Sequence, residues 1–221
     1  GNVGADHIVF TDSPSTAEPL DERADFGTLG LALLEPQPDD AAALSLPAGS
    51  LAEEIFPGQQ PTTADAEVTR PFGRKLVGAI LRKLALKPNE SATVTFVVTW
   101  HFPNLQLDPV RGSSGRHYAK RFASAAAVAE YVAQNFGTLS SPTRLCHDTW
   151  YDSTLPYWFL DRTFANASIL ASSTCHWFED GRFYGWEGVG CCAGTCTHVW
   201  HYAHAVARLF PQLERDLRER T

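Results

Sequence analysis

The period of the apolar residues changes near residue 110, and this change limits the folds open to the chain. Before it, short apolar runs at residues 7–10 and 29–34 are separated by frequent prolines, as in short strands joined by long loops. After it, apolar residues recur every three or four positions, at Tyr118, Phe122, Ala125, Ala129, Val132 and Phe136. This spacing is typical of a helix with one buried face. We therefore expect a mixed α+β chain.

The clearest predicted strand covers residues 92–100, where β-branched residues alternate with others after a turn at residues 87–90. We interpret residues 1–108 as the C-terminal part of an antiparallel β-sandwich, and residues 103–115, rich in Pro, Gly and Ser, as a linker. Residues 109–221 then form a helical second domain.

Three helices and one hairpin are expected in the second domain. The first helix is predicted to end at Ser140–Pro142, the second to begin near Pro156, and the third to kink or split at Pro211. Asp180 and Gly181 stand between two aromatic runs, which predicts a hairpin with a two-residue turn.

Composition excludes several classes of protein. The net charge is −7, from 18 Lys and Arg against 25 Asp and Glu, so the chain offers no basic stripe for nucleic acid. No apolar run is long enough to span a membrane, and no secretory pattern opens the chain. Five clustered cysteines suit reduced thiols in a cytosolic enzyme better than a disulfide framework. The chain has no methionine and ends within a helical pattern, so we expect a piece of a longer protein, whose compartment cannot be read.

Residues 185–200 form the most unusual stretch, with four glycines, three cysteines, two tryptophans, one histidine and a single acid, Glu187. Its Cys191, Cys192 and Cys196, with His198 and His201, could supply the four ligands of a zinc site. The stretch lacks a repeated Cys-x-x-Cys pair, so thiols packed behind a loop are the preferred interpretation. We expect no metal and no cofactor.

Five motifs resemble the start of the catalytic domain of glycoside hydrolase family 116, which includes non-lysosomal glucosylceramidases and bacterial β-glucosidases. They are HDTWYDSTLPYWF at 147–159, NASIL at 166–170, GRFYGWEG at 181–188, THVWHYA at 197–203 and LFPQLE at 209–214. The Gly-Cys-Cys and Cys-Thr-His-Val-Trp runs are closest to the uncharacterised bacterial branch. The resemblance covers residues 88–221, and residues 1–87 show no matching motif.

The resemblance implies an N-terminal β-sandwich, the first helices of an (α/α)6 barrel, and a retaining exo-β-glycosidase. It places the nucleophile at Glu187 and sugar contacts at Trp186, Thr197 and His198. The family has an aspartate eleven residues after the nucleophile, where this chain has His198. An imidazole offers one donor and one acceptor where a carboxylate only accepts, so this departure leaves the sugar specificity open. Trp186 could instead pack in the hairpin core, and His198 could be a buried, hydrogen-bonded histidine.

The acid/base of the family is an aspartate in a barrel segment that this chain does not contain, so the chain is expected to be inactive alone. The other carboxylates considered as local partners are Asp148, Asp152, Asp161, Glu179 and Asp180. Asp180 suits a turn, and Asp161 a solvated or ion-paired helix face. Asp148 and Asp152, spaced i, i+4, could point into a barrel mouth, but helix N-caps are the preferred interpretation. Two alternatives remain open: a carbohydrate-binding or scaffold protein that has lost catalysis, and a metal-binding structural module.

Overall fold

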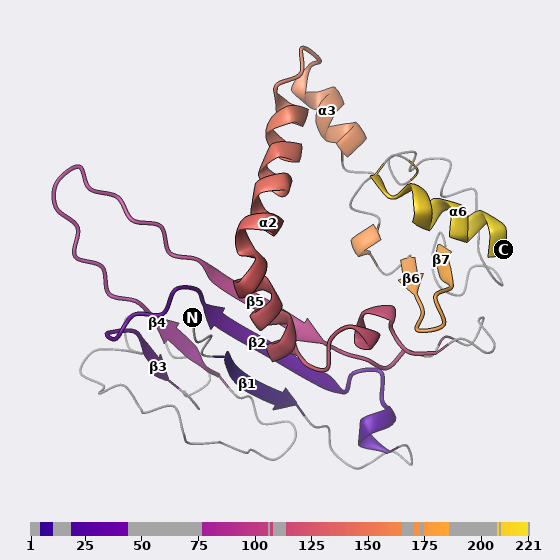
Figure 1. Cartoon of the computed structure of the whole chain (residues 1–221), viewed down its shortest axis with the longest axis horizontal. Helices are drawn as coiled ribbons and strands as arrows, with labels where there is room; N and C mark the ends of the chain where they lie inside the picture. Colours follow the sequence, from indigo (N-terminus) through magenta and orange to yellow (C-terminus); the bar gives the residue numbers. More distant parts are fainter. Residues whose placement is uncertain are drawn as a thin grey trace. The chain divides into compact units, whose positions relative to one another are not determined.

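The computed structural model describes residues 5–10, 19–43, 77–105, 107, 114–164, 170–172, 175–185, 207 and 209–220 (Figure 1). The chain divides into two compact units, residues 1–102 with 122–135 and residues 103–121 with 136–221, and each is described by itself. The strands are β1 (Ala5–Phe10), β2 (Gly27–Leu33), β3 (Ala41–Ala43), β4 (Ala79–Leu81), β5 (Phe96–His101), β6 (Cys175–Trp177) and β7 (Phe183–Gly185). The helices are η1 (Leu20–Glu22), η2 (His117–Lys120), α2 (Ala125–Tyr151), α3 (Tyr157–Phe164) and α6 (Pro211–Arg220).

The mixed α+β class is confirmed, because small antiparallel sheets stand beside α-helices in the described residues. The strands expected at residues 7–10 and 29–34 are present as β1 and β2, and the strand expected at 92–100 is present as β5, which begins four residues later than predicted, at Phe96. The turn before β5 is also present, with the Glu90 N–H donating to the Lys87 carbonyl at 3.0 Å. The sandwich, the barrel and the domain boundary at residue 108 stay predictions.

The first unit is built on a three-stranded antiparallel sheet in the order β1-β2-β5. In its register Leu29, Leu31 and Leu33 of β2 lie opposite Trp100, Val98 and Phe96 of β5, so these leucines and β5 residues share one face. Thr28, Gly30 and Ala32 lie opposite His101, Thr99 and Val97 on the other face. The two faces therefore differ in chemistry: one is apolar and the other carries small and polar residues.

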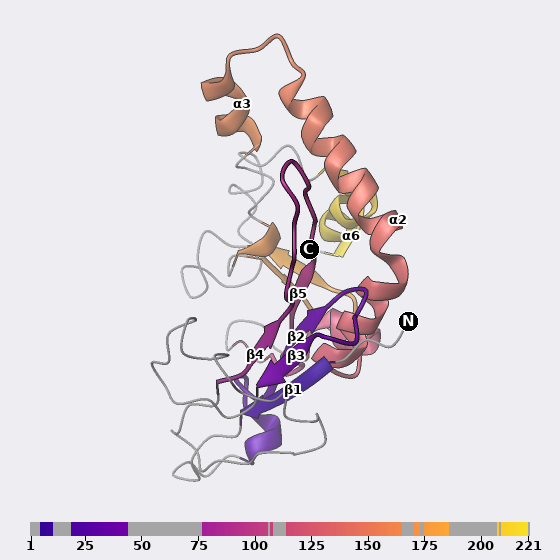
Figure 2. The same ribbon diagram turned by 90° about the vertical axis from the view of Figure 1, so that its left-hand side faces the viewer.

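Helix α2 begins against the small, polar face of this sheet (Figures 1 and 2). The Ala125 N–H donates to Thr28 Oγ1 at 2.9 Å, and the Thr99 hydroxyl donates to the Ala125 carbonyl at 2.9 Å. His101 Nε2 lies 2.7 Å from the Phe122 carbonyl oxygen, which can only accept a hydrogen bond. Both polar side chains of β5 on this face, Thr99 and His101, are buried and hydrogen-bonded, as burial of polar groups requires.

Gly30 makes this close approach of helix and sheet possible. A Cβ atom at Gly30 would lie 2.6 Å from Thr99 Oγ1 and 3.7 Å from the Ala125 Cβ. The helix presents alanines to the sheet, and Ala125 and Ala129 are almost fully buried. Small residues on both surfaces therefore set the distance between α2 and the sheet.

Two expectations for the first helix are wrong. It begins at Ala125 and not near Tyr118, because Ser124 caps it: Ser124 Oγ accepts from the Ala127 N–H at 3.2 Å. It also continues through Pro142 to Tyr151, and the Thr143 hydroxyl donates to the Leu139 carbonyl at 2.8 Å beside the proline. The irregular residue is Asn135 (φ −117, ψ 15), whose side-chain amide donates to the Tyr131 carbonyl. A side-chain bond to the helix ladder accounts for a kink at this position.

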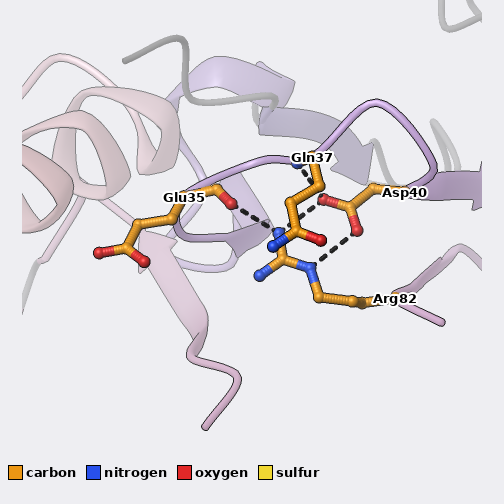
Figure 3. A network of polar contacts seen from close by, with 4 residues as sticks. All are labelled: Glu35, Gln37, Asp40 and Arg82. Carbon is orange, nitrogen blue, oxygen red and sulfur yellow. Dashed lines mark hydrogen bonds and ion pairs between the residues drawn. The ribbon is translucent and has the colours of Figure 1, made fainter. Parts of the chain in front are cut away.

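A bidentate ion pair closes the loop between β2 and β3 onto the residue that follows β4 (Figure 3). Arg82 donates from Nε and Nη2 to the two carboxylate oxygens of Asp40 at 2.8 and 2.6 Å, and from Nη2 to the Glu35 carbonyl at 2.7 Å. Asp40 also accepts from the Gln37 N–H at 2.7 Å. The hydrogen bonds from Arg82 hold the pKa of the Asp40 carboxyl below its usual value of 3.8.

Replacement of Gly30 by alanine is expected to destabilise the first unit by about 1–3 kcal/mol, because the new methyl group overlaps Thr99 Oγ1. The matched control is Gly137→Ala, since a Cβ at this helical glycine has nothing within 4 Å. The control should stabilise the protein by about 0.5–1 kcal/mol. Chemical denaturation measures both, and a Gly30→Ala variant as stable as the parent would contradict the close approach.

The Asp40–Arg82 pair should make the stability of the first unit depend on acidic pH. Because the folded pKa of Asp40 is lowered, its contribution is complete above the unfolded pKa near 3.8 and is lost as the pH falls through the folded pKa. Asp40→Asn should therefore be less stable than the parent at neutral pH, and the difference should shrink on acidification. Denaturation curves from neutral pH to pH 2 test this, and a difference that stays constant over this range would exclude the pair as its source.

Candidate functional site

The residues predicted to carry the chemistry, Trp186, Glu187, Thr197 and His198, lie outside the described residues, as do Cys191, Cys192, Cys196 and His201. The description of this region stops at Gly185, two residues before Glu187. Their placement near one another therefore stays a prediction. The hairpin β6–β7 leads directly into this stretch and lies within the described residues. Its packing therefore sets the geometry at the start of the predicted site.

The predicted hairpin is confirmed, with Cys175, His176 and Trp177 opposite Gly185, Tyr184 and Phe183. Its loop holds the three residues 179–181 and not two, because the Phe178 N–H donates to the Arg182 carbonyl at 2.8 Å and closes the ladder one residue earlier. Asp180 accepts from the Arg182 N–H at 2.9 Å, which confirms its turn role. Gly181 has φ +87, a conformation that a residue with a side chain rarely adopts.

One side of the hairpin packs on helix α6. Phe183 of β7 and Leu217 of α6 are buried together, with Leu213, Leu170 and Cys175 against them. The expected third helix is thus present in its last part, where α6 begins at Pro211 as a first-turn proline can. Its earlier part, up to residue 206, lies outside the described residues. The Cys175 thiol is packed among apolar side chains, whereas Cys146 is exposed.

The other side of the hairpin packs on the segment around Leu105. Phe178 is 0% exposed and forms a second buried cluster with Leu105, against which Leu107 and Tyr184 pack. Backbone bonds reinforce this contact: the Gly115 N–H donates to the Leu105 carbonyl at 2.9 Å, and the Glu179 N–H donates to the Gly115 carbonyl at 3.2 Å. Strand β7, which enters the predicted catalytic stretch, is therefore held by apolar side chains from both sides.

A stacked pair of rings joins η2 to the hairpin. The rings of His117 and Trp177 have centroids 3.7 Å apart and planes 4° apart, and Lys120 Nζ donates to the Glu179 carbonyl at 3.2 Å. Burial, together with the charge of Lys120, lowers the pKa of His117 below its usual value. Nothing in the sequence pattern indicated this contact, because residues 117 and 177 meet only through the fold.

The motif at residues 147–159 joins the end of α2 to α3. Trp150 Nε1 donates to the Leu160 carbonyl at 3.3 Å, and the Tyr151 hydroxyl donates to Asp161 at 3.0 Å. This hydrogen bond to Asp161 raises the pKa of Tyr151 above its usual value. The second helix starts after Pro156 as predicted. Asp161 lies on an exposed face of α3, also as predicted.

The N-cap role expected for Asp148 is wrong, because this residue lies in the last turn of α2, where its carboxylate contacts His147 at 3.0 Å. Asp152 follows the end of α2 and is exposed. The chain between the two helices is instead shaped by Ser153 Oγ, which accepts from the Leu155 N–H at 3.1 Å. Asp148 and Asp152 are solvated and show no role in a described site.

Within the described ranges no three His, Cys, Asp or Glu side chains are grouped closely enough to hold a metal ion. No helix in that same part of the chain has the length and apolar character needed to cross a membrane.

A family model described as "beta-glucosidase 2, glycosyl-hydrolase family 116 N-term" matches residues 48–139. The match begins upstream of the resemblance, so residues 48–87, where no motif was recognised, also carry the family pattern. It ends at residue 139, before the motifs that suggested a catalytic domain. None of the curated proteins matches the chain.

Phe178→Ala should destabilise the second unit by about 3–5 kcal/mol, because it empties a fully buried site between the hairpin and Leu105. Phe159→Ala is the matched control, since Phe159 on α3 is 40% exposed and its loss should cost about 1 kcal/mol or less. Denaturation followed by tryptophan fluorescence compares the two. Equal losses for both variants would show that the hairpin is not anchored through Phe178.

Proposed function

Because residues 48–139 belong to an N-terminal domain of glycosyl-hydrolase family 116, we propose that the chain is part of a retaining exo-β-glycosidase that acts on β-glucosides. The family match carries this proposal. It suggests a glycosidase of the β-glucosidase type, and the motifs from residue 147 onwards supply the finer assignment. The substrate class is a glycoside with a sugar at its non-reducing end.

Glu187 is the nucleophile in this proposal. A retaining glycosidase attacks the anomeric carbon with one ionised carboxylate, and a second carboxyl group about 5–5.5 Å away protonates the leaving oxygen and then activates water. The packing of β7 supports the assignment, because Glu187 follows the end of β7 by two residues. On one side of the strand Phe183 packs against Leu217, and on the other Tyr184 packs against Phe178 and Leu105. A nucleophile must be held by a rigidly packed neighbouring element, because small displacements from the reacting carbon lower the rate steeply.

The second carboxyl group is proposed to come from a barrel segment that this chain does not contain. The described carboxylates offer poor substitutes: Asp148 is exposed and paired with His147, and Asp180 is engaged in its turn. Trp186 is proposed to contact the sugar ring, with Thr197 and His198 near its hydroxyl groups.

The β-sandwich and the helical barrel are proposed as the surroundings of this fragment. The sheet of the first unit favours the proposal of a second β layer, because Val98 and Trp100 on its apolar face are 65% and 61% exposed. Helix α3 supports further helices, because its Tyr157 and Trp158 are 68% and 70% exposed. Large apolar side chains exposed to this extent on a sheet or a helix are normally covered by another layer of secondary structure.

A second candidate function is a carbohydrate-binding or scaffold protein of the same fold. It is favoured by His198, which stands where the family carries a sugar-binding aspartate. Such a protein would bind a sugar without hydrolysing it.

Activity measurements distinguish a glycosidase from a protein that binds a sugar without hydrolysing it. The 221-residue chain should not hydrolyse aryl β-glucosides, whereas the protein extended through its second carboxyl group should release β-configured sugar. In the extended protein Glu187→Gln should abolish turnover and leave folding intact, and Asp148→Asn should leave turnover unchanged. Turnover by Glu187→Gln at the parent rate would remove Glu187 from the mechanism, and sugar binding without any turnover would favour the scaffold.

A further inference from the structure

In the part of the chain that the structure describes, β5 is an edge strand of the first unit's sheet. Among the described strands it pairs with β2 only, in the order β1-β2-β5. An edge strand carries a row of N–H and C=O groups that can pair with another chain, and proteins usually protect such edges with lysine, proline, a bulge or a covering segment. Residues 91–100 contain no charged residue and no proline, so β5 shows none of the sequence protections.

The hydrogen-bond pattern identifies the groups that face this edge. The Leu34 N–H donates to the Thr95 carbonyl at 3.0 Å, which continues the β2–β5 register by one residue. Because bonding direction alternates along an antiparallel pair, Val97 and Thr99 direct their backbone groups toward β2. Phe96, Val98 and Trp100 direct theirs away from β2, and the same residues have exposed side chains (46%, 65% and 61%).

These outward groups are arranged symmetrically about Val98. If a second β5 lies antiparallel with Val98 opposite Val98 of its copy, then Phe96 falls opposite Trp100 and Trp100 opposite Phe96. In this register every outward N–H and C=O group of the three residues finds a partner. Each Phe96 also meets a Trp100 directly across the strands, and aromatic cross-strand pairs are among the stabilising ones. A shift of register by two residues leaves some of these groups unpaired.

Charge favours the same arrangement. The chain has a net charge of −7, which opposes self-association in general. The segment from Ser91 to Trp100 is uncharged, so two copies can approach along β5 without like charges facing each other. Two copies can therefore pair along this edge, although the net negative charge of the chain otherwise opposes their association.

We propose that β5 is a self-association edge, through which two copies of this chain join their sheets antiparallel about a twofold axis at Val98. Pairing along one short strand buries less than the roughly 1,200 Å² of a stable interface, so the association is weak and depends on concentration. The twofold arrangement closes on itself, because each copy uses its single β5 edge.

Sedimentation of the 221-residue chain over a concentration series tests the proposal. A reversible shift from one to two copies is expected. Val98→Lys places two ammonium groups opposite each other at the axis and should keep the chain monomeric at all concentrations, whereas Val98→Thr should still form dimers. Leu86→Lys is the matched control, since it adds the same charge at an exposed leucine outside β5 and should leave the dimer intact.

Amide hydrogen exchange locates the interface. The amides of Phe96, Val98 and Trp100 should exchange fast in dilute samples and slowly in concentrated ones, while those of Val97 and Thr99 should be protected throughout by β2. Protection of Val97 and Thr99 in Val98→Lys shows that this variant keeps its sheet. A chain that stays monomeric at every concentration, a dimer without new protection in β5, or an open-ended assembly would each overturn the proposal.

Discussion

The hydrogen bonds that seat the first turn of α2 on the sheet are the constraint on which the first unit depends. Ala125 is held through both its backbone groups, by Thr28 and Thr99, and Gly30 leaves the space for this contact. Because the helix needs hydroxyl partners and small neighbours, the polar side of β5 is the buried side. An amphipathic strand usually buries its apolar side chains and exposes its polar ones. In β5 this arrangement is reversed, so its apolar side chains are exposed and can contact other partners.

Local chemistry was enough to predict β1, β2 and β5, the turn before β5, and the hairpin at Asp180 and Gly181, because each depends on neighbouring residues. The short strands β3 and β4 were not predicted. The start of α2 could not be predicted from its periodicity, since Tyr118 and Phe122 continue the apolar spacing but the Ser124 cap and the sheet contacts decide where the helix begins. Pro142 was expected to end the helix, yet α2 continues through it.

Recognition of the family from the sequence was confirmed, although the matched residues 48–139 only overlap the region that suggested it. Residues 48–87 contain no short motif typical of the family, so the resemblance could not be recognised there from motifs. For the candidate site, the hairpin was predictable, but its anchoring by Leu105 and Leu217 was not, because these residues are far apart in the sequence. The roles of Glu187 and His198 rest on motif and position, two and thirteen residues beyond the end of β7.

The proposed nucleophilic role of Glu187 requires a covalent bond between this residue and the sugar, and trapping that intermediate tests the role most directly. The protein extended through its second carboxyl group would be treated with an activated 2-deoxy-2-fluoro-β-glucoside, which slows hydrolysis of a glycosyl-enzyme, and then digested for peptide mass spectrometry. If Glu187 is the nucleophile, one fluoroglucosyl group is expected on the peptide that contains it. A label on a different carboxylate would contradict it.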